Sequence, residues 1–247
     1  MKISIVTASF NNRDTIKHTL ESVASQKNCE VEHVVIDGGS TDGTLEILKE
    51  FPGIVFLSEP DKGIYDALNK GVKLASGDVV GTLGADDFYP HEHVLERICA
   101  RFKNPDTDVV YSDKNYVHPS DLNKVVRHWT SGEYKRENWL KGWMPPHLSF
   151  YIRRKYFDKY GYYNTDFRSA GDYELMLRMM YKHELRIDYL PELTVTMRTG
   201  GTSTASFKNR WRANREDKRA WEINGLKPRW YTLIMKPLSK LHQFFPS

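Results

Sequence analysis

Short apolar runs alternate with amphipathic segments through the first 113 residues, and this rhythm restricts the possible folds more than any other feature of the chain. Runs rich in β-branched residues predict strands at 3–8, 31–36, 54–57, 78–83 and 109–112. Apolar residues three and four positions apart predict helices at 15–26, 41–51, 64–75 and 90–102. Because strands and helices alternate with short connections, we expect an α/β fold with a mostly parallel sheet flanked by helices.

The remainder of the chain is less regular. Strand-like runs occur at 125–129, 148–152 and 193–198. Helix-like segments occur at 172–182 and 207–223, and a glycine-containing loop is expected at 199–204. The predicted organisation is a domain over 1–206, with a parallel half at 1–113 and a smaller mixed half at 114–206, followed by a helical extension at 207–247.

Composition excludes several classes of protein. Hydrophobic residues make up 40% of the chain, enough to fill a core, which excludes global disorder. No run of about 18 apolar residues predicts a membrane span, and the N-terminus lacks the apolar segment of a signal peptide. Cys29 and Cys99 form no CxxC or Cys/His cluster, which argues against a zinc site and a disulfide scaffold. We therefore expect free thiols and a cytoplasmic protein.

Charge is unevenly distributed along the chain. Residues 1–130 contain 14 Lys and Arg against 20 Asp and Glu, whereas residues 131–247 contain 22 against 12. A basic second half favours an anionic partner, such as a phosphorylated ligand, a membrane surface or nucleic acid.

Acidic residues follow the predicted strands at the edge where ligands of such folds bind. Neither GxGxxG after the first strand nor GxxxxGK[ST] occurs, which disfavours a dinucleotide oxidoreductase and a P-loop kinase. Instead, Asp37 follows the second strand, and the adjacent Asp86 and Asp87 follow the fourth. Neighbouring carboxylates repel each other, and a bound cation relieves that repulsion. Hard oxygen ligands favour Mg²⁺ or Mn²⁺, with diphosphate oxygens completing the coordination.

Four ordered motifs carry a family resemblance. They are IVTASFN at 5–11, VIDGGSTDGT at 35–44, SEPDKGIYDALNKG at 58–71 and LGADD at 83–87. In this order and spacing they resemble the family 2 glycosyltransferases of the GT-A fold. The resemblance spans about residues 1–113 and continues more loosely through His147, 171–175 and 200–203. It implies an inverting enzyme that moves a sugar from a nucleotide-sugar donor to a hydroxyl group.

The resemblance also implies roles around the nucleotide. Ala8 and Phe10 would line the base pocket, with Phe10 against the face of the base. Asp37 would accept a hydrogen bond from the base, typically uracil, which makes a UDP-sugar the expected donor. Asp61 and Lys62 lie where the family approaches the nucleotide, and Lys62 is either a phosphate contact or a solvated lysine.

The acidic pair and one arginine are the candidates for the donor diphosphate. By resemblance, Asp86 would hold the ribose hydroxyls and Asp87 would bind Mn²⁺ or Mg²⁺. Because Gly84 and Ala85 precede the pair, the metal would depend chiefly on Asp87 and the diphosphate. Arg198 is a candidate for neutralising the leaving group.

Asp172 is the candidate catalytic base. Inverting transfer needs one carboxylate to take the proton of the acceptor hydroxyl. Asp172 follows Gly171 at the start of a predicted helix, where the helix dipole favours the ionised form. His147 occupies a position common on the acceptor side of the family, although a structural histidine fits equally well there.

The extension is basic and aromatic. Residues 207–247 contain 10 Lys and Arg against 3 Asp and Glu, interleaved with aromatic side chains. This composition is typical of a segment at an anionic membrane surface, so we expect residues 226–247 to attach the protein to the inner face of the membrane. A saccharide or a lipid-diphosphate-linked saccharide in cell-surface polysaccharide synthesis would suit such a location. Packing of the tail on the domain or on a second subunit is the alternative, and no motif supports nucleic-acid binding.

Two other functions fit parts of the pattern. A sugar nucleotidyltransferase also needs a nucleotide pocket, acids and Mg²⁺, but residues 9–13 lack the glycine-rich basic loop such enzymes carry after the first strand. A non-catalytic carbohydrate- or lipid-binding module would not need a base such as Asp172.

Overall fold

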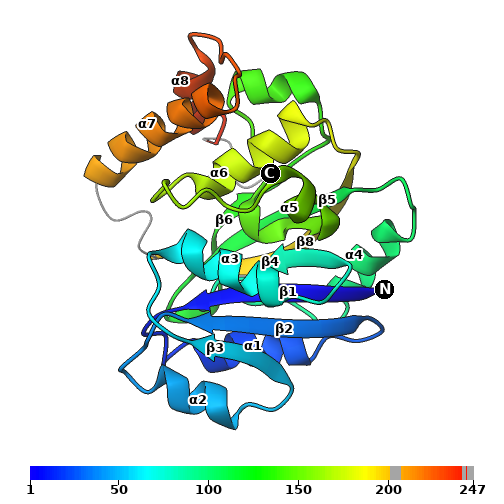
Figure 1. The fold of residues 1–247 in the computed structure, drawn as a ribbon, viewed down its shortest axis with the longest axis vertical. Helices are drawn as coiled ribbons and strands as arrows, with labels where there is room; N and C mark the ends of the chain where they lie inside the picture. The colour runs from blue at the N-terminus through cyan, green and yellow to red at the C-terminus, as the bar shows by residue number, and fades with distance from the viewer. Residues whose placement is uncertain (201–206, 241–242, 244–247) are drawn as a thin grey trace.

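The computed structural model describes residues 1–200, 207–240 and 243, and only the backbone of residues 207–212. Most of the predicted loop at 199–204 therefore lies outside the described residues. One sheet organises the described chain, in the order β3-β2-β1-β4-β7-β5-β6, with β8 paired to β5 (Figure 1). Its strands are β1 (Lys2–Ser9), β2 (Glu30–Asp37), β3 (Ile54–Ser58), β4 (Val79–Thr82), β5 (Val109–His118), β6 (Asp121–Trp129), β7 (Phe150–Arg153) and β8 (Ile187–Arg198).

The sheet has a parallel part and a mixed part. β1 pairs in parallel with β2 and β4, and β2 pairs in parallel with β3. β7 then runs antiparallel to both β4 and β5, while β5 is antiparallel to β6 and parallel to β8. The predicted α/β class, with a mixed second region, is confirmed. The division into two halves and an extension stays a prediction, because the sheet is continuous from β3 to β6.

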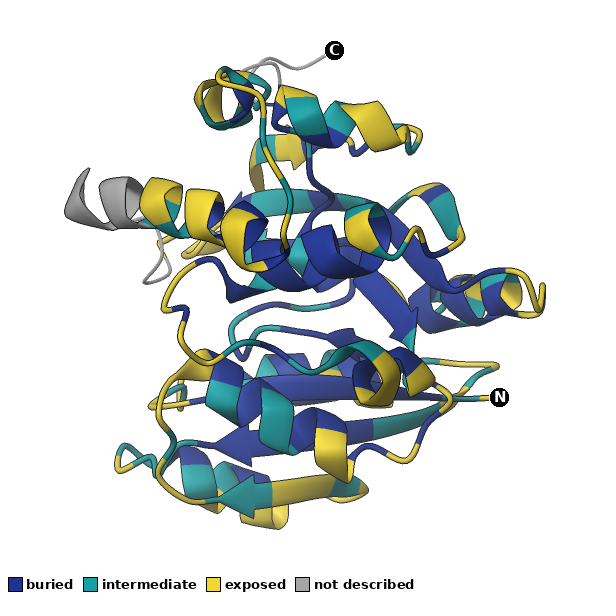
Figure 2. Ribbon diagram, turned by 45° about the horizontal axis from the view of Figure 1, so that its top comes forward, coloured by how far each residue is buried: buried dark blue, intermediate teal, exposed yellow. Residues whose placement is uncertain are grey.

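Helices cover both faces of the sheet (Figures 1 and 2). They are α1 (Ile16–Ala24), α2 (Thr44–Glu50), α3 (Ile64–Leu74), α4 (Val94–Phe102), α5 (Lys155–Tyr160), α6 (Gly171–Met176), α7 (Phe207–Ile223) and α8 (Thr232–Leu238). Alternation along β1 builds the two cores: Ile3 and Ile5 join α1 and α4, whereas Val6 joins α3, α5, α6 and α7. Figure 2 shows the central strands buried and the outer helix surfaces exposed.

Several predicted elements have different bounds in the structure; the strands predicted at 125–129 and 193–198, for example, begin at Asp121 and Ile187. The strand predicted at 109–112 continues to His118, because β6 and β8 cover its polar residues on both edges. The helix predicted at 90–102 begins only at Val94, since the Gln26 side chain bonds the His91 carbonyl and the Leu95 amide. The helix predicted at 172–182 divides into α6 and a π-helical segment, η3 (Leu177–Lys182).

The expectation of two free thiols is wrong. Cys29 and Cys99 form a disulfide with their Cα atoms 6.7 Å apart. Cys29 lies just before β2, and Cys99 lies on the buried side of α4, so packing of α4 on the sheet brings them together. The sequence does not predict this pairing, because the two cysteines are 70 residues apart and only the fold brings them together. The cysteines therefore give no argument for a reducing compartment.

The C-terminal helices pack on other helices: α7 contacts α6, and α8 contacts the 3-10 segment η1 (Arg136–Lys141) and α7 (Figure 1). Trp221 of α7 is fully buried and donates a hydrogen bond of 2.9 Å to the Tyr173 hydroxyl. α8 is fixed by Thr232, whose hydroxyl donates to the Leu140 carbonyl at 2.6 Å. Of the helices that the structure describes, none combines the length and apolar character needed to cross a membrane.

Candidate active site

The candidate site forms along one edge of the sheet, where β1, β2, β3 and β4 end. The parallel register places Asp37, at the end of β2, beside Ser58, at the end of β3. β7 runs antiparallel to β4 with Gly81 beside Tyr151, so the chain entering β7 meets the chain leaving β4. His147 begins the 3-10 turn η2 (His147–Ser149), which contacts β4. The sheet therefore brings the nucleotide-side and acceptor-side candidates to one edge.

Phe10, Gly38 and Asp61 converge at the nucleotide end of this edge. A side-chain carbon on Gly38 would lie 2.5 Å from an Asp61 oxygen and 3.3 Å from the Phe10 ring, so any larger residue would displace these two side chains from their present positions. Phe10 is 61% exposed, which leaves its ring open for stacking. Asp61 Oδ1 accepts the Gly63 amide at 2.8 Å, and the neighbouring Lys62 is exposed.

The Asp37 carboxylate is engaged in hydrogen bonds within the protein. It is fully buried, and Oδ2 accepts hydrogen bonds from the amides of Gly39 and Ser40 and from the Ser58 hydroxyl, at 3.1, 3.0 and 2.7 Å. Oδ1 accepts the Ser40 hydroxyl. The carboxylate thus fixes the loop that carries Gly38, while Ala8 on the adjacent β1 is half-buried. Direct contact of Asp37 with a base stays a prediction.

Asp86 and Asp87 form an acidic pair after β4. Asp87 is 1% exposed, and its Oδ1 accepts the Arg198 amide at 3.1 Å. Burial, followed by the charge of Asp86, raises the pKa of Asp87 to about 7. Burial also raises the pKa of Asp86. Gly84 makes room for the pair, because a side chain there would collide with the Asp87 carboxylate. A divalent cation fits this arrangement, since it would favour the ionised forms.

The acidic pair does not form a complete metal cage. Within the described part of the chain, no group of three or more His, Cys, Asp or Glu side chains is placed to hold a metal ion. Asp87, with Asp86 beside it, supplies hard oxygen ligands of the kind that Mg²⁺ and Mn²⁺ prefer. The remaining ligands would have to come from water or from a bound diphosphate.

Arg198 joins the acidic pair at the end of β8. Its guanidinium donates to the Asp86 carbonyl and to His18 Nδ1, the latter at 2.7 Å. The same group lies 5.2 Å from the centroid of the Phe88 ring. Arg198 is 9% exposed, so these contacts hold a nearly buried cation beside the carboxylates. The candidate for leaving-group neutralisation is thus brought to the candidate metal ligands.

Asp172 lies at the start of α6 between two hydrogen-bond donors. The Tyr65 hydroxyl donates to Oδ1 at 3.3 Å, and His147 Nδ1 lies 3.2 Å from Oδ2. Burial, followed by the charge of Asp172, keeps the pKa of Tyr65 well above its ordinary value, so the phenol stays protonated. Gly171 allows Tyr65 to approach, because a side-chain carbon there would lie 2.8 Å from the ring.

His147 is neutral in this arrangement. Partial burial lowers its pKa below the ordinary value, and the positive charges of Lys114 and Lys240 act in the same direction, against the carboxylate of Asp172. Because a carboxylate only accepts hydrogen bonds, a neutral His147 would carry its proton on Nδ1 and donate to Asp172. Two donors therefore orient the Asp172 carboxylate and leave lone pairs open for a further proton.

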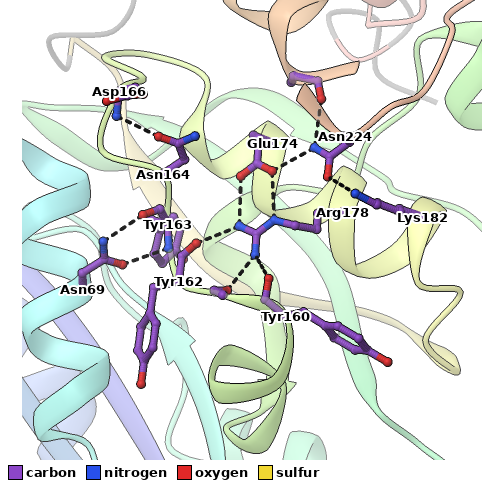
Figure 3. Close-up of polar contacts among 12 residues, drawn as sticks. Asn69, Tyr160, Tyr162, Tyr163, Asn164, Asp166, Glu174, Arg178, Lys182 and Asn224 are labelled. Carbon is purple, nitrogen blue, oxygen red and sulfur yellow. Dashed lines mark hydrogen bonds and ion pairs between the residues drawn. The ribbon is translucent and has the colours of Figure 1, made fainter. Parts of the chain in front are cut away.

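A buried ion pair anchors the helix that carries Asp172 (Figure 3). Arg178 Nε lies 2.9 Å from Glu174 Oε1, four residues earlier on the same helical stretch. The Arg178 guanidinium also donates to the carbonyls of Tyr160, Gly161 and Tyr162, at 2.5 to 2.7 Å. This network ties α6 and η3 to the loop after α5, so the base is held on a rigid support.

Sequence reasoning missed three residues at the site. Tyr65 and His18 lie on predicted helices, and neither has a neighbouring motif that indicates contact with Asp172 or Arg198. Lys114 follows a predicted strand, yet it is 2% exposed. The available sequence signal of its burial was that Lys114 lies two residues before Tyr116, on the same face of the strand.

Comparisons with known proteins agree with this geometry. The family model described as Glycosyl transferase family 2 matches residues 4–182. A PGL/p-HBAD biosynthesis glycosyltransferase of Mycobacterium tuberculosis is 29% identical, over 76% of this chain and 73% of the relative.

Two solved structures share the fold. The 1–349 fragment of S. aureus TarS, in complex with UDP-GlcNAc, superposes with a TM-score of 0.73 at 19% identity, covering 95% of this chain and 69% of that one. Against the longer TarS chain, the match spans 43% of its length. The mannosyltransferase PcManGT from Pyrobaculum calidifontis, in complex with GDP-Man and Mn²⁺, gives 0.68 at 20% identity, covering 97% and 69%. At these identities the likeness shows a common GT-A fold.

Proposed function

This chain belongs to glycosyl transferase family 2 and is a glycosyltransferase, and from that premise we propose that it transfers a sugar with inversion from a UDP-sugar to a hydroxyl group of a saccharide acceptor. The observation that carries the proposal is the single carboxylate of Asp172, which Tyr65 and His147 orient on the sheet edge that also carries the acidic pair. One oriented base is what a direct displacement requires.

The proposed reaction is a single displacement. An Asp172 oxygen accepts the proton of the acceptor hydroxyl, and the acceptor oxygen forms a bond to the anomeric carbon as the bond to the nucleoside diphosphate breaks. The electron pair of the broken bond stays on the diphosphate. Arg198 offsets part of this charge from its place beside the acidic pair. Bound to Asp87, Mn²⁺ or Mg²⁺ would supply further electrostatic stabilisation of the leaving group.

The nucleotide end of the edge supports a nucleotide-sugar donor. We assign base stacking to the exposed ring of Phe10, with Ala8 lining the same pocket. Asp37 holds the loop beneath this pocket, and Asp61 and Lys62 border it. Asp86 would accept hydrogen bonds from the ribose hydroxyls. The ligands in complex with the two structural neighbours, UDP-GlcNAc in one and GDP-Man with Mn²⁺ in the other, support the donor class and a divalent ion.

The test is a donor screen with UDP-, GDP- and dTDP-sugars, with Mn²⁺ or Mg²⁺ present and then removed by chelation. We expect metal-dependent release of nucleoside diphosphate from one donor family, with UDP-sugars the most active. Release of pyrophosphate instead would indicate a nucleotidyltransferase. Binding of saccharide without nucleotide turnover under any condition would indicate a non-catalytic module.

We also propose that the tail attaches the protein to an anionic membrane. Packing and attachment are compatible, because Thr232 docks α8 on the domain while Ile234 and Leu238 of α8, and Trp230 just before it, are 56%, 49% and 85% exposed. Exposed aromatic and aliphatic groups beside a net positive tail suit the interface of an anionic bilayer. A lipid-diphosphate-linked saccharide of the cell surface would then be within reach of the site.

Vesicle co-sedimentation tests this attachment. We expect binding to phosphatidylglycerol vesicles but not to phosphatidylcholine vesicles, weakened about tenfold in Trp230→Ala because a large apolar group leaves the interface. Val55→Ala is the matched control, since Val55 is 44% exposed on β3, away from the tail. Equal binding of all three proteins, or no binding to the anionic vesicles, would contradict the attachment.

A further inference from the structure

Cationic and aromatic side chains alternate on one face of the β5–β6 hairpin. In the antiparallel register Lys114 lies opposite Trp129, and Tyr116 lies opposite Arg127. Because residues two apart on a strand share a face, these four side chains lie on the same side. Lys114 Nζ is 4.6 Å from the Tyr116 ring centroid and 5.1 Å from that of Trp129. Arg127 stacks over the same two rings at 4.8 and 5.3 Å.

Lys114 is nearly buried, and no carboxylate of the described residues lies at salt-bridge distance from its ammonium group. It is 2% exposed, and its contacts in the described part of the chain are the two rings and the Met197 sulfur, 3.4 Å from Nζ. Burying an ammonium is unfavourable unless an anion or strong acceptors replace its water. Aromatic rings compensate only in part. An anionic ligand beside Lys114 would offset the remaining cost of burying its ammonium group.

The tail adds further positive charge at this face. Lys240 Nζ lies 4.5 Å from the centroid of the Trp129 ring, and no carboxylate pairs with it among the described residues. Lys236 pairs with Asp217 at 2.6 Å. Burial, and then the charges of Lys236 and Lys114, lower the pKa of Lys240 to about 7. Among the described residues, the buried carboxylate of Asp217 thus faces both Lys236 and Lys240.

This cluster borders the candidate active site. Met197, whose sulfur Lys114 Nζ contacts, directly precedes Arg198, whose amide donates to Asp87 Oδ1 at 3.1 Å. On the other side, the Ser149 hydroxyl donates at 2.8 Å to the carbonyl of Ser112, which ties the 3-10 turn of His147 to β5 two residues before Lys114. Lys240 lies over the Trp129 ring, which is opposite Lys114. Positive charge therefore continues from the acidic pair past His147 towards the tail. The donor diphosphate is already served by Arg198 and the metal site, so the charge beyond His147 suits a second anion.

We propose that Lys114 and Lys240 bind a phosphate or diphosphate group of the acceptor, next to the hydroxyl that Asp172 deprotonates. The inference rests on the proposed function and narrows it, because it assigns the acceptor to phosphorylated saccharides. Two ammonium groups match the oxygens of a phosphate, and Trp129 and Tyr116 supply an apolar wall that lowers the local dielectric and strengthens the contacts.

Calorimetric titration with inorganic pyrophosphate tests the site in the presence of EDTA, which removes the metal from the donor site. We expect the wild-type protein to bind pyrophosphate and Lys240→Gln to bind it about tenfold more weakly, because a charged hydrogen bond is lost. Lys227→Gln, which removes an exposed charge from the same tail, should bind normally. Asp87→Asn should also bind pyrophosphate normally. Lys114→Gln, if its thermal midpoint is retained, should weaken binding at least as much as Lys240→Gln.

A parallel titration with UDP and Mn²⁺ separates the two sites. We expect Asp87→Asn to lose UDP binding and Lys240→Gln to keep it. No pyrophosphate binding by the wild type, equal binding by Lys240→Gln, or loss of binding in Asp87→Asn would overturn the acceptor site. Failure of every protein to bind UDP, with pyrophosphate binding intact, would instead count against the proposed function.

Farnesyl diphosphate distinguishes the source of the phosphate. Tighter binding than inorganic pyrophosphate, still sensitive to Lys240→Gln, would support a lipid-linked acceptor. Equal affinity for the two probes would support a soluble phosphorylated saccharide.

Discussion

Replacing Asp172 with asparagine is expected to lower kcat about a thousandfold, since general-base catalysis contributes about 10²–10⁴ in rate. Asparagine keeps an oxygen that can accept the Tyr65 hydroxyl, and a neutral His147 can change tautomer to accept from the new amide. The geometry should therefore survive while the proton acceptor is lost. The measurement is nucleoside diphosphate release at saturating donor and acceptor.

Donor affinity is the internal control for this variant. Because Asp172 lies on α6 rather than among the nucleotide-end residues, the Kd for UDP with Mn²⁺ should stay within about twofold of the wild type. Asp166→Asn is the matched control, since this 69% exposed carboxylate in the loop before α6 pairs only with Arg219 among the described residues. Retention of more than about a tenth of the wild-type kcat by Asp172→Asn would show that another group takes the proton.

The sequence predicted those parts of the fold in which local pattern and tertiary environment agree. β1, β4 and the second half of β2 are buried strands whose apolar runs predict them, and β3 also follows from its apolar residues, although Val55 and Phe56 are exposed. β5 was predicted too short because Asp113, Lys114 and Asn115 look like a loop, and only pairing with β6 and β8 makes them a strand. Tertiary contacts therefore set the C-terminal limit of β5 and the N-terminal limit of α4.

The candidate site divides in the same way. Asp86, Asp87 and Asp172 stand in motifs, so sequence reasoning could single them out. Their partners could not be found, because the contact of Tyr65 with Asp172 joins residues 107 positions apart and that of Arg198 with His18 joins residues 180 apart. That Lys114 is buried, with no carboxylate of the described residues at salt-bridge distance, is visible only in the structure.

Asp87→Asn is expected to weaken Mn²⁺-dependent donor binding about a hundredfold, because a neutral amide oxygen replaces the main charged ligand and several kcal/mol of electrostatic stabilisation depend on the ion. The substitution preserves volume, and the new amide oxygen can still accept the Arg198 backbone amide. Loss of donor binding should therefore occur with a thermal midpoint at or above that of the wild type in the absence of metal, because burial disfavours the ionised form of Asp87. UDP titrations with and without Mn²⁺ measure the effect, and electron paramagnetic resonance of Mn²⁺ reports the bound ion directly.

The neighbouring Asp86 makes the result interpretable, since the two carboxylates are assigned different tasks. Asp86→Asn should weaken donor binding by about tenfold through the ribose, while the ratio of affinities with and without Mn²⁺ stays near that of the wild type. Asp87→Asn should instead bring that ratio close to one. If both variants reduced donor affinity but left the response to Mn²⁺ intact, the metal would have to rest on residues other than the acidic pair. If Asp86→Asn and Asp87→Asn lost the response to Mn²⁺ equally, both carboxylates would bind the ion. The assignment of Asp86 to the ribose alone would then be wrong.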